Sequence, residues 1–273
     1  MRVEQQPLKK TLGAMAANDW PQWDGPSERE RRRLAEIVTR YVRFLNPSIV
    51  EKIVRDNKIH RAKWEELLLE CGTDPSGYLW DGSSCCFPGV RRHSGKKEIS
   101  EFSRKTQDFE NALALDDNRF PKQIWSYVFR NTGFSNYGPQ GYQLAHLIDH
   151  KDVYGRLSTE LVFSNSAEVT PIPGLFTSPA NTAYVPVDFL KPTDFESKLR
   201  SLLQRKARSL YSDVCSILPP GVSIAEEPDQ DWSLDEFDWP DTVGTIDHVP
   251  EFLLFREKKM TELFEERLSR IDP

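Results

Sequence analysis

Hydrophobic residues recur at helical spacing soon after the start of the chain. Residues 1–25 carry no periodic pattern and are rich in Gln, Asn and Pro, so we expect a mobile leader there. Ser27 and Glu30 then form a capping box, the reciprocal hydrogen-bonding pattern that starts many helices. Apolar residues follow at helical intervals as far as Leu45. The pattern predicts a first helix that runs from Ser27 to Leu45.

Two more helices are predicted before residue 72. Asn46 and Pro47 end the first helix and start the second, because proline fits the first turn of a helix but not its interior. The second helix continues to Val54. The third contains Trp64 and ends at Gly72, since glycine readily takes the left-handed conformation that closes a helix. We therefore expect the N-terminal region to be helical.

Residues 73–130 change from loop back to helix. Turn-forming dipeptides interrupt residues 73–93, which we expect to form loops and short strands. A helix around Trp125 follows and leads to Gly133. Between these segments lies a basic run that we predict to contact phosphates, with Arg91, Arg92, Lys96 and Lys97 as its main residues. An ordinary solvated surface would have the same composition, so this alternative stays open.

Short apolar segments broken by Gly, Pro, Asn and Ser begin after Gly133. Residues 142–148 and 161–163 are the strand candidates. A second capping box, formed by Thr193 and Glu196, predicts a long amphipathic helix behind it. That helix covers residues 193–215, and we predict that two of its basic positions, Arg205 and Lys206, bind nucleic acid. The order strand, strand, helix makes an α+β fold the expected class.

The C-terminal fifth of the chain differs sharply in charge from the rest. The whole chain has a net charge of −6. Residues 221–273 hold 15 Asp or Glu and 5 Lys or Arg, a balance of −10, which leaves +4 for residues 1–220. A mildly basic body permits binding to phosphates. Within the acidic part, residues 252–271 are expected to form a strand or a helix.

The four cysteines and the leader indicate where the protein resides. Cys71, Cys85, Cys86 and Cys215 form no CxxC pair, so we interpret them as reduced thiols rather than zinc ligands. The first twenty residues lack the apolar region of a secretory signal, and no stretch is apolar enough to span a bilayer. We expect a cytoplasmic protein with no membrane association.

His146 and His150 flank Asp149, and Asn181 follows downstream ahead of the predicted basic helix. These residues resemble the HNH, or ββα-metal, nuclease motif, in which a His lies near the first strand, an Asn after the second, and a helix closes a metal site. Its "A-H-I" opening is similar to Ala145-His146-Leu147, and its "N-L-x-x-L" centre is similar to residues 181–185. The resemblance covers residues 142–215.

The resemblance implies a metal-dependent endonuclease that hydrolyses DNA phosphodiester bonds, of the restriction or defence type. His146 would be the general base, since imidazole titrates near neutral pH. Asp149 and the amide oxygen of Asn181 would hold Mg²⁺ or another divalent cation such as Mn²⁺. In this family the Asn either coordinates the metal or orients the base, and both roles stay open. DNA is the implied partner, and a homodimer is compatible with this interpretation.

Two departures from the motif leave alternatives. The acidic ligand that often precedes the base is Ala145 here, so either Asp149 replaces it or His150 is the base. The last ligand on the helix is not evident, and Asp188 and Asp194 are the nearest candidates. Asn181 also follows a Ser-Pro pair, and a simple turn residue would stand in the same place.

The interpretation divides the chain into four regions. They are a leader over 1–25, a helical region over 26–130 that positions DNA, a ββα-metal core over 131–220, and an acidic segment over 221–273. In the acidic segment, eight carboxylates between residues 224 and 247 stand among tryptophans. We expect an ordinary solvated loop with its tryptophans tucked into the core, and the alternative is a gate that imitates DNA phosphates against the basic helix.

Two rival functions remain from the sequence. Asp241, Glu257 and Lys259 match a PD-(D/E)XK nuclease pattern if residues 252–255 form the strand before it. The other rival is a non-catalytic adaptor that binds nucleic acid or protein through its helices and acidic tail, and it predicts no metal dependence.

Overall fold

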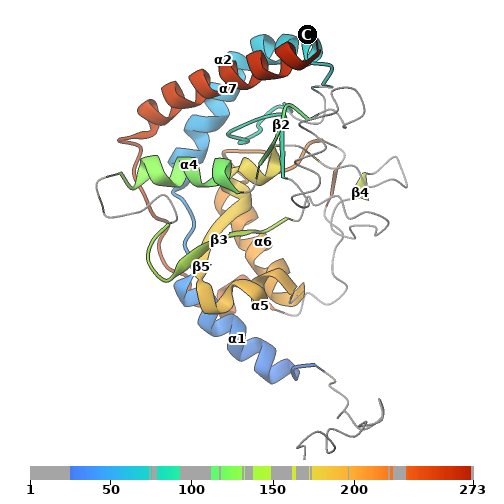
Figure 1. The fold of residues 1–273 in the computed structure, drawn as a ribbon. Coiled ribbons are helices and arrows are strands. Elements are labelled where there is room, and N and C mark those ends of the chain that lie inside the picture. The colour runs from blue at the N-terminus through green and yellow to red at the C-terminus, as the bar shows by residue number, and fades with distance from the viewer. Residues whose placement is uncertain are drawn as a thin grey trace, which may run out of the picture.

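Our computed structural model describes residues 25–73, 75, 79–92, 112–116, 118–130, 132, 138–148, 162–163, 172, 174–195, 197–220, 222–223 and 232–271. Helices and short strands are mixed along the chain, which confirms the α+β class (Figure 1). Within those residues, no helix combines the length and the apolar character that crossing a bilayer requires.

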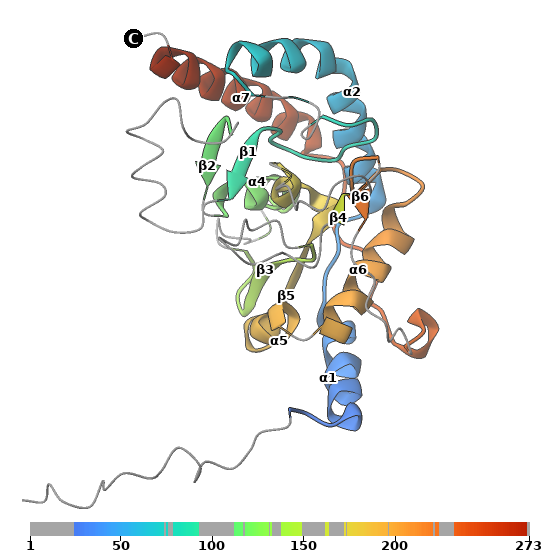
Figure 2. The ribbon, with the colours of Figure 1, turned by 90° about the vertical axis from the view of Figure 1, so that its right-hand side faces the viewer.

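A two-stranded antiparallel ribbon lies between two groups of helices. Strand β3 (Tyr142–His146) pairs with β5 (Thr182–Pro186). The register places Tyr142 opposite Pro186 and His146 opposite Thr182. Helices α2 (Pro47–Glu70), α4 (Arg119–Val128) and α7 (Val249–Ile271) lie on one side of this ribbon. Helices α1 (Glu28–Tyr41) and α5 (Leu190–Phe195) lie on the other (Figure 1; Figure 2 gives the view turned by 90°).

The two faces of the ribbon belong to different hydrophobic cores, because side chains alternate along a strand. Ala145, Ala183 and Val185 face the core that contains α1 and α6. Tyr184 lies in the other core, with α2, α4 and α7, and Leu144 packs against it. Small residues on one face and larger ones on the other therefore let the ribbon join both cores.

Helix α1 (Glu28–Tyr41) begins as the sequence predicts. The Ser27 hydroxyl accepts a hydrogen bond from the backbone of Glu30, and the Glu30 carboxylate accepts one from the Ser27 backbone N–H at 2.8 Å. The capping box is thereby confirmed, and the chain before the helix is held against its first turn.

The predicted end of this helix at Leu45 is wrong. The helix stops at Tyr41, and Arg43 instead exchanges two backbone hydrogen bonds with Tyr184, at 2.9 and 3.0 Å. Leu45 forms a further bridge to Val243. The segment thus adds to the free edge of β5, where paired backbone groups outweigh the helical spacing of its apolar residues.

Helix α2 (Pro47–Glu70) replaces the second and third predicted helices with one. Its start is confirmed, since the Asn46 side chain accepts from the Ser48 backbone N–H and Pro47 occupies the first turn. Its end is confirmed too, because Gly72 has a φ of +70° and donates to the Leu69 carbonyl at 2.9 Å. The apolar stripe pauses after Val54, but no glycine or proline interrupts the helix there.

The remaining strands are short. β1 (Val90–Arg92) pairs in parallel with β2 (Ala114–Asp116), and β4 (Val162–Phe163) pairs with β6 (Val222–Ser223). The predicted strand at 161–163 exists over 162–163, yet its partner is β6 and the partner of β3 is β5. Asn181 therefore stands before the second strand of the central ribbon, not after it.

The predicted capping box at residue 193 is wrong. Thr193 lies inside the short helix α5 (Leu190–Phe195), and its hydroxyl donates to the Leu190 carbonyl at 2.6 Å. A separate helix, α6 (Ser197–Tyr211), follows it. Glu196, the other half of the predicted box, lies outside the described residues.

Helix α7 (Val249–Ile271) resolves the strand-or-helix alternative for the C-terminus. It packs against α2 and against α4 (Arg119–Val128), the helix predicted around Trp125. Helix α2 and the C-terminal helix α7 therefore share one core, while α1 contributes to the other core with α6.

Candidate functional site

His146 is the last residue of β3, on the ribbon face that carries Tyr184. Its ring is half-buried and tilted against Phe176, with centroids 6.0 Å apart. Its Nε2 lies 3.1 Å from the Phe176 carbonyl oxygen. A carbonyl only accepts hydrogen bonds, so Nε2 is the donor in this contact.

Asn181 is fully buried and holds the chain that follows His146. Its Oδ1 accepts from the Ile148 backbone N–H at 2.8 Å, and its Nδ2 donates to the Ile148 carbonyl at 3.3 Å. Nδ2 also donates to the Leu175 carbonyl at 3.3 Å. The side chain thus copies the hydrogen bonding of a neighbouring strand at the point where β3 ends.

Helix α6 also binds the chain that follows His146. The Gln204 Nε2 donates to the Leu147 carbonyl at 2.6 Å, and the Leu147 N–H donates to the Asn181 carbonyl at 3.0 Å. The two residues after His146 are consequently held by a buried amide and by a helix. The sequence analysis missed Gln204, because nothing in a single sequence distinguishes it from a surface glutamine.

The structure brings His146 and Asn181 together, but not as two ligands of one metal. Both donor hydrogens and one acceptor position of the Asn181 amide are used by the backbone, and the side chain is 0% exposed. Asp149 and His150 lie outside the described residues. Within the described part of the chain, no three His, Cys, Asp or Glu side chains are grouped as a metal site. The described residues therefore do not supply a ligand set.

The helix-borne ligand candidates do not fill that gap. Asp188 follows Pro186, at the end of β5 remote from His146, and its side chain is exposed. The side chain of Asp194 lies outside what the structure describes. The prediction of Asp188 as a metal ligand beside His146 is therefore wrong, because the antiparallel register places the two residues at opposite ends of the ribbon.

Of the four residues predicted to contact phosphates in the basic run, the structure describes Arg91 and Arg92. Arg91 is only 4% exposed in β1, so its guanidinium is not presented to a ligand. Arg92 is half-buried beside it, and Lys96 and Lys97 lie outside the described residues. The prediction for Arg91 is corrected by burial, which the charge pattern alone does not reveal.

On α6, the predicted pair of basic residues points away from the Gln204 contact. Residues four apart share a helix face, so Arg200 and Arg208 flank Gln204. Lys206 lies on another face, with its ammonium 5.1 Å from the ring centroid of Trp239. Burial lowers the pKa of Arg205, whose Nε is enclosed. Arg200 and Arg208 are therefore the basic residues one turn before and one turn after Gln204 on α6.

The PD-(D/E)XK alternative loses its strand. Residues 252–255 belong to α7, so no strand precedes Glu257. Glu257 faces Lys63 and His60 at 3.3 and 3.9 Å, whereas Lys259 pairs with Glu262 at 2.8 Å. Glu257 is thus paired with residues of α2, whereas Lys259 is paired with a residue of α7 itself.

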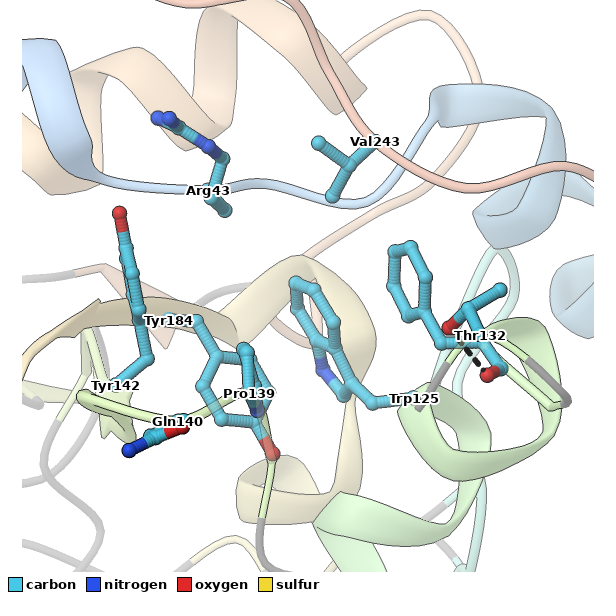
Figure 3. Close-up of a pocket in the computed structure, with 9 residues that line it drawn as sticks. Arg43, Trp125, Thr132, Pro139, Gln140, Tyr142, Tyr184 and Val243 are labelled. Atoms are coloured by element: carbon cyan, nitrogen blue, oxygen red, sulfur yellow. Dashed lines mark hydrogen bonds between the residues drawn. The ribbon is translucent and has the colours of Figure 1, made fainter. Parts of the chain in front are cut away.

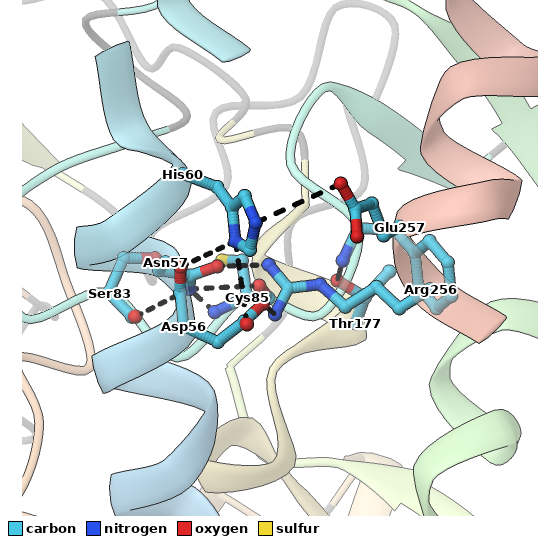
Figure 4. Close-up of polar contacts among 9 residues, drawn as sticks. Asp56, Asn57, His60, Ser83, Cys85, Thr177, Arg256 and Glu257 are labelled. Atoms are coloured by element: carbon cyan, nitrogen blue, oxygen red, sulfur yellow. Dashed lines mark hydrogen bonds and ion pairs between the residues drawn. The ribbon is translucent and has the colours of Figure 1, made fainter. Parts of the chain in front are cut away.

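A second polar cluster joins α2 to α7 in the core that these helices share with α4 (Figure 4). The Arg256 guanidinium is fully buried, bonds to Asp56 at 3.0 Å and to the Asn57 side chain, and lies 4.5 Å over the Trp64 ring. The Asn57 Nδ2 donates to the Ser83 carbonyl at 2.7 Å. The hydrogen bonds of Arg256 to Asp56 and Asn57 cross from α7 to α2, so the cluster fastens the two helices together.

Within the acidic segment, residues 232–239 pack on α1 and α6. Trp232 and Phe237 are 4% and 7% exposed, which confirms the expectation of buried aromatic residues over this part. The carboxylate of Glu236 pairs with Arg32 at 2.6 Å, and that of Asp238 with Arg40 at 3.4 Å. These carboxylates pair with α1, not with the basic helix that the gate hypothesis requires.

Comparison with known proteins adds no relative. A scan against protein-family models, a search of curated proteins and a search of solved structures each found no match. The function has to be inferred from the geometry described above.

Proposed function

We propose that this protein is a metal-dependent nuclease of the HNH kind that hydrolyses DNA phosphodiester bonds. The observation that supports the proposal is that two side chains, Asn181 and Gln204, hold the backbone just after His146. A half-buried histidine ends a strand, and a buried asparagine and a helix fix the chain just after it. The antiparallel pair β3–β5 is followed by helices, as the resemblance implies, whereas Asn181 precedes β5 instead of following it.

In this proposal, His146 is the general base. The Nε2 contact with the Phe176 carbonyl orients the ring, and the imidazole would take the proton of an attacking water. Asn181 would orient the base rather than coordinate a cation, because its amide already binds the Ile148 backbone. Rigid support of this kind matters because proton transfer requires a short, aligned contact.

A divalent cation would offset the charge that develops on the phosphate and the leaving oxygen. Asp149 is the ligand that the resemblance names. On α6, Arg208 is exposed on the face of Gln204 and would attract the DNA backbone toward His146.

Cleavage of plasmid DNA by the full-length protein tests the proposal. Wild-type protein is expected to nick or linearise the plasmid with Mg²⁺ or Mn²⁺ and to lose this activity with EDTA. His146→Ala should lower the rate by at least about a hundredfold, in line with loss of a general base. His248→Ala is the matched control, since His248 pairs with Glu251 at the surface of α7.

The outcome also separates the alternatives. Loss of activity in His150→Ala but not in His146→Ala would move the base to His150. Equal activity in all three histidine variants would refute the proposal. DNA binding without cleavage under any metal condition would favour the adaptor.

A further inference from the structure

A pocket of about 430 Å³ opens beside the other end of the β3–β5 ribbon. Four of the side chains that line it are aromatic: Trp125, Phe129, Tyr142 and Tyr184. Figure 3 shows Arg43 and Val243 on one side of the pocket, with Pro139, Tyr142 and Trp125 on the other. This volume lies within the range that small-molecule sites in proteins occupy.

The aromatic rings are held in fixed orientations. Trp125 meets Tyr184 edge-on with centroids 4.7 Å apart, and its indole N–H donates to the Thr182 hydroxyl at 3.3 Å. Phe129 stacks on Trp125 at 6.1 Å. Tyr184 is packed so closely that a Cβ at Gly138 would lie 2.4 Å from its ring. The floor of the pocket is therefore closely packed. Trp125 and Tyr184 are each 1% exposed, so the accessible aromatic surface comes from the partly buried Phe129 and Tyr142.

The rim is more polar and carries a charge. Gln140 and Thr132 are exposed there, and Tyr142 is half-buried. Arg43 is the charged residue among the described lining residues. Its Nη1 donates to the carbonyls of Arg40 and Val42, at 3.3 and 3.0 Å, which fixes the guanidinium at the end of α1. A planar ring with an anionic group close by matches this distribution of surfaces.

The pocket shares a strand with the proposed catalytic histidine. Tyr142 and His146 are the first and last residues of β3, so they lie roughly 13 Å apart along the strand, on the same face. Thr182, which accepts the hydrogen bond from Trp125, is the register partner of His146. A nucleic-acid strand positioned at His146 could therefore place a neighbouring nucleotide over the pocket.

We propose that this pocket binds a nucleotide, with the base stacked on the partly buried rings of Phe129 and Tyr142 and a phosphate near Arg43. The choice of a nucleotide rests on the proposed nuclease function, whereas the preference for a flat anionic ligand rests on the pocket alone. Stacking on aromatic side chains tolerates every base, so the site discriminates little between sequences. The nucleotide is either free or part of a single strand.

Binding is measured with full-length His146→Ala protein, so that no probe is cleaved. The probes are AMP, ribose 5-phosphate, a single-stranded octanucleotide, and the same octanucleotide with one abasic position. Isothermal titration gives the affinities, and the indole N–H resonance of Trp125 reports whether the pocket is the place of binding. We expect AMP to bind at least about tenfold more tightly than ribose 5-phosphate, because only AMP has a base to stack.

Two kinds of variant locate the ligand, each made in the His146→Ala background. Tyr142→Ala removes one stacking ring and should weaken AMP binding about 5- to 150-fold, with Tyr41→Ala, an exposed tyrosine on α1, as its control. Gln140→Trp fills the mouth from an exposed position without disturbing the core, and should also abolish binding. Arg43→Ala should weaken AMP more than adenosine, with the exposed Arg55→Ala as control.

The results distinguish the sources and the two proposals. Tighter binding of the octanucleotide than of AMP, reduced at the abasic position, identifies a strand, and equal binding identifies a free nucleotide. AMP binding that disappears in Gln140→Trp supports the pocket even if the wild-type protein cleaves no DNA. Equal affinity for AMP and ribose 5-phosphate, or unchanged affinity in both Tyr142→Ala and Gln140→Trp, would overturn the pocket proposal even if cleavage is observed.

Discussion

Two histidines, His60 and His146, lie in polar clusters that differ in what the neighbouring side chains bind. His60 lies on α2 against Asp56, with Nδ1 and Oδ1 3.4 Å apart, and stacks on Trp64 beside the buried Arg256. His146 ends a strand, and the polar side chain next to it, Asn181, binds backbone rather than another side chain. The first cluster joins two helices, and the second fixes one turn of chain.

The difference shows why a dense polar cluster is not by itself a site. Around His60 the charges are neutralised by each other, and Arg256 is enclosed between α2 and α7. Beside His146, the side chains of Asn181 and Gln204 hydrogen-bond to the backbone of residues 147 and 148. That backbone in turn positions the imidazole. A cluster that satisfies itself stabilises the fold, whereas a cluster that positions one titratable group can support chemistry.

The largest expected effect is on Arg256. Arg256→Ala removes one partner of a buried ion pair and leaves Asp56 and Asn57 without the guanidinium, which should lower the free energy of unfolding by about 3–5 kcal/mol. Urea unfolding measures the loss, with the exposed Lys258→Ala as control. Cleavage per folded molecule should not change, and a specific loss of cleavage would break the distinction between the clusters.

Asn181→Ala should act on both stability and activity. The variant leaves the Ile148 N–H and two buried carbonyls without their partner, which should cost about 1–3 kcal/mol. Cleavage by the folded fraction should fall at least about tenfold, since His146 loses its support. Gln143→Ala, an exposed amide on the same strand, is the control. Normal cleavage at reduced stability would reduce Asn181 to a turn residue.

Two cysteines beside the Arg256 cluster provide a pH-dependent probe of it. Burial raises the pKa of the Cys85 and Cys86 thiols from 9.0 to about 12. Above pH 9 the thiols of the unfolded chain lose protons while the folded ones keep them, so stability should fall as pH rises from about 9 toward 12. Urea unfolding at pH 8 and pH 10 measures this slope, which should diminish in the double variant Cys85→Ala/Cys86→Ala.

The same thiols should be inert in the folded protein, because thiolate is the reactive form. Alkylation at pH 8 should be slow in native protein and fast in urea, and Arg256→Ala should accelerate it by opening the cluster. Fast alkylation of Cys85 in the wild-type protein would show that the cluster opens readily.

The smallest effect is expected at the exposed pair of Arg32 and Glu236. Both side chains are more than a third exposed, so solvent screens their attraction. Arg32→Ala and Glu236→Gln, alone and combined, should leave no resolvable coupling in urea unfolding at physiological salt. A clear coupling that persists at high salt would mean that the acidic segment is held by charge rather than by Trp232 and Phe237.

Local signals determined where several elements begin and end. The Ser27–Glu30 capping box, Asn46 with Pro47, and Gly72 act through neighbouring backbone atoms, so the sequence alone predicted them. The same holds for the strand at residues 142–146 and for the helix around Trp125. These features depend on residues a few positions apart, and single-sequence patterns report such separations well.

Tertiary structure decided the pairings and the exposure of the charges. Apolar spacing carried the first predicted helix to Leu45, but the unpaired edge of β5 drew Arg43 into an extended bridge. Arg91 looked basic and available, yet the fold buries it. The Gln204 contact with Leu147 and the aromatic pocket join residues far apart in the chain. Sequence order fixed the candidates His146 and Asn181, while only long-range packing determined that one of them supports the other, because buried backbone groups must find partners wherever the fold brings them.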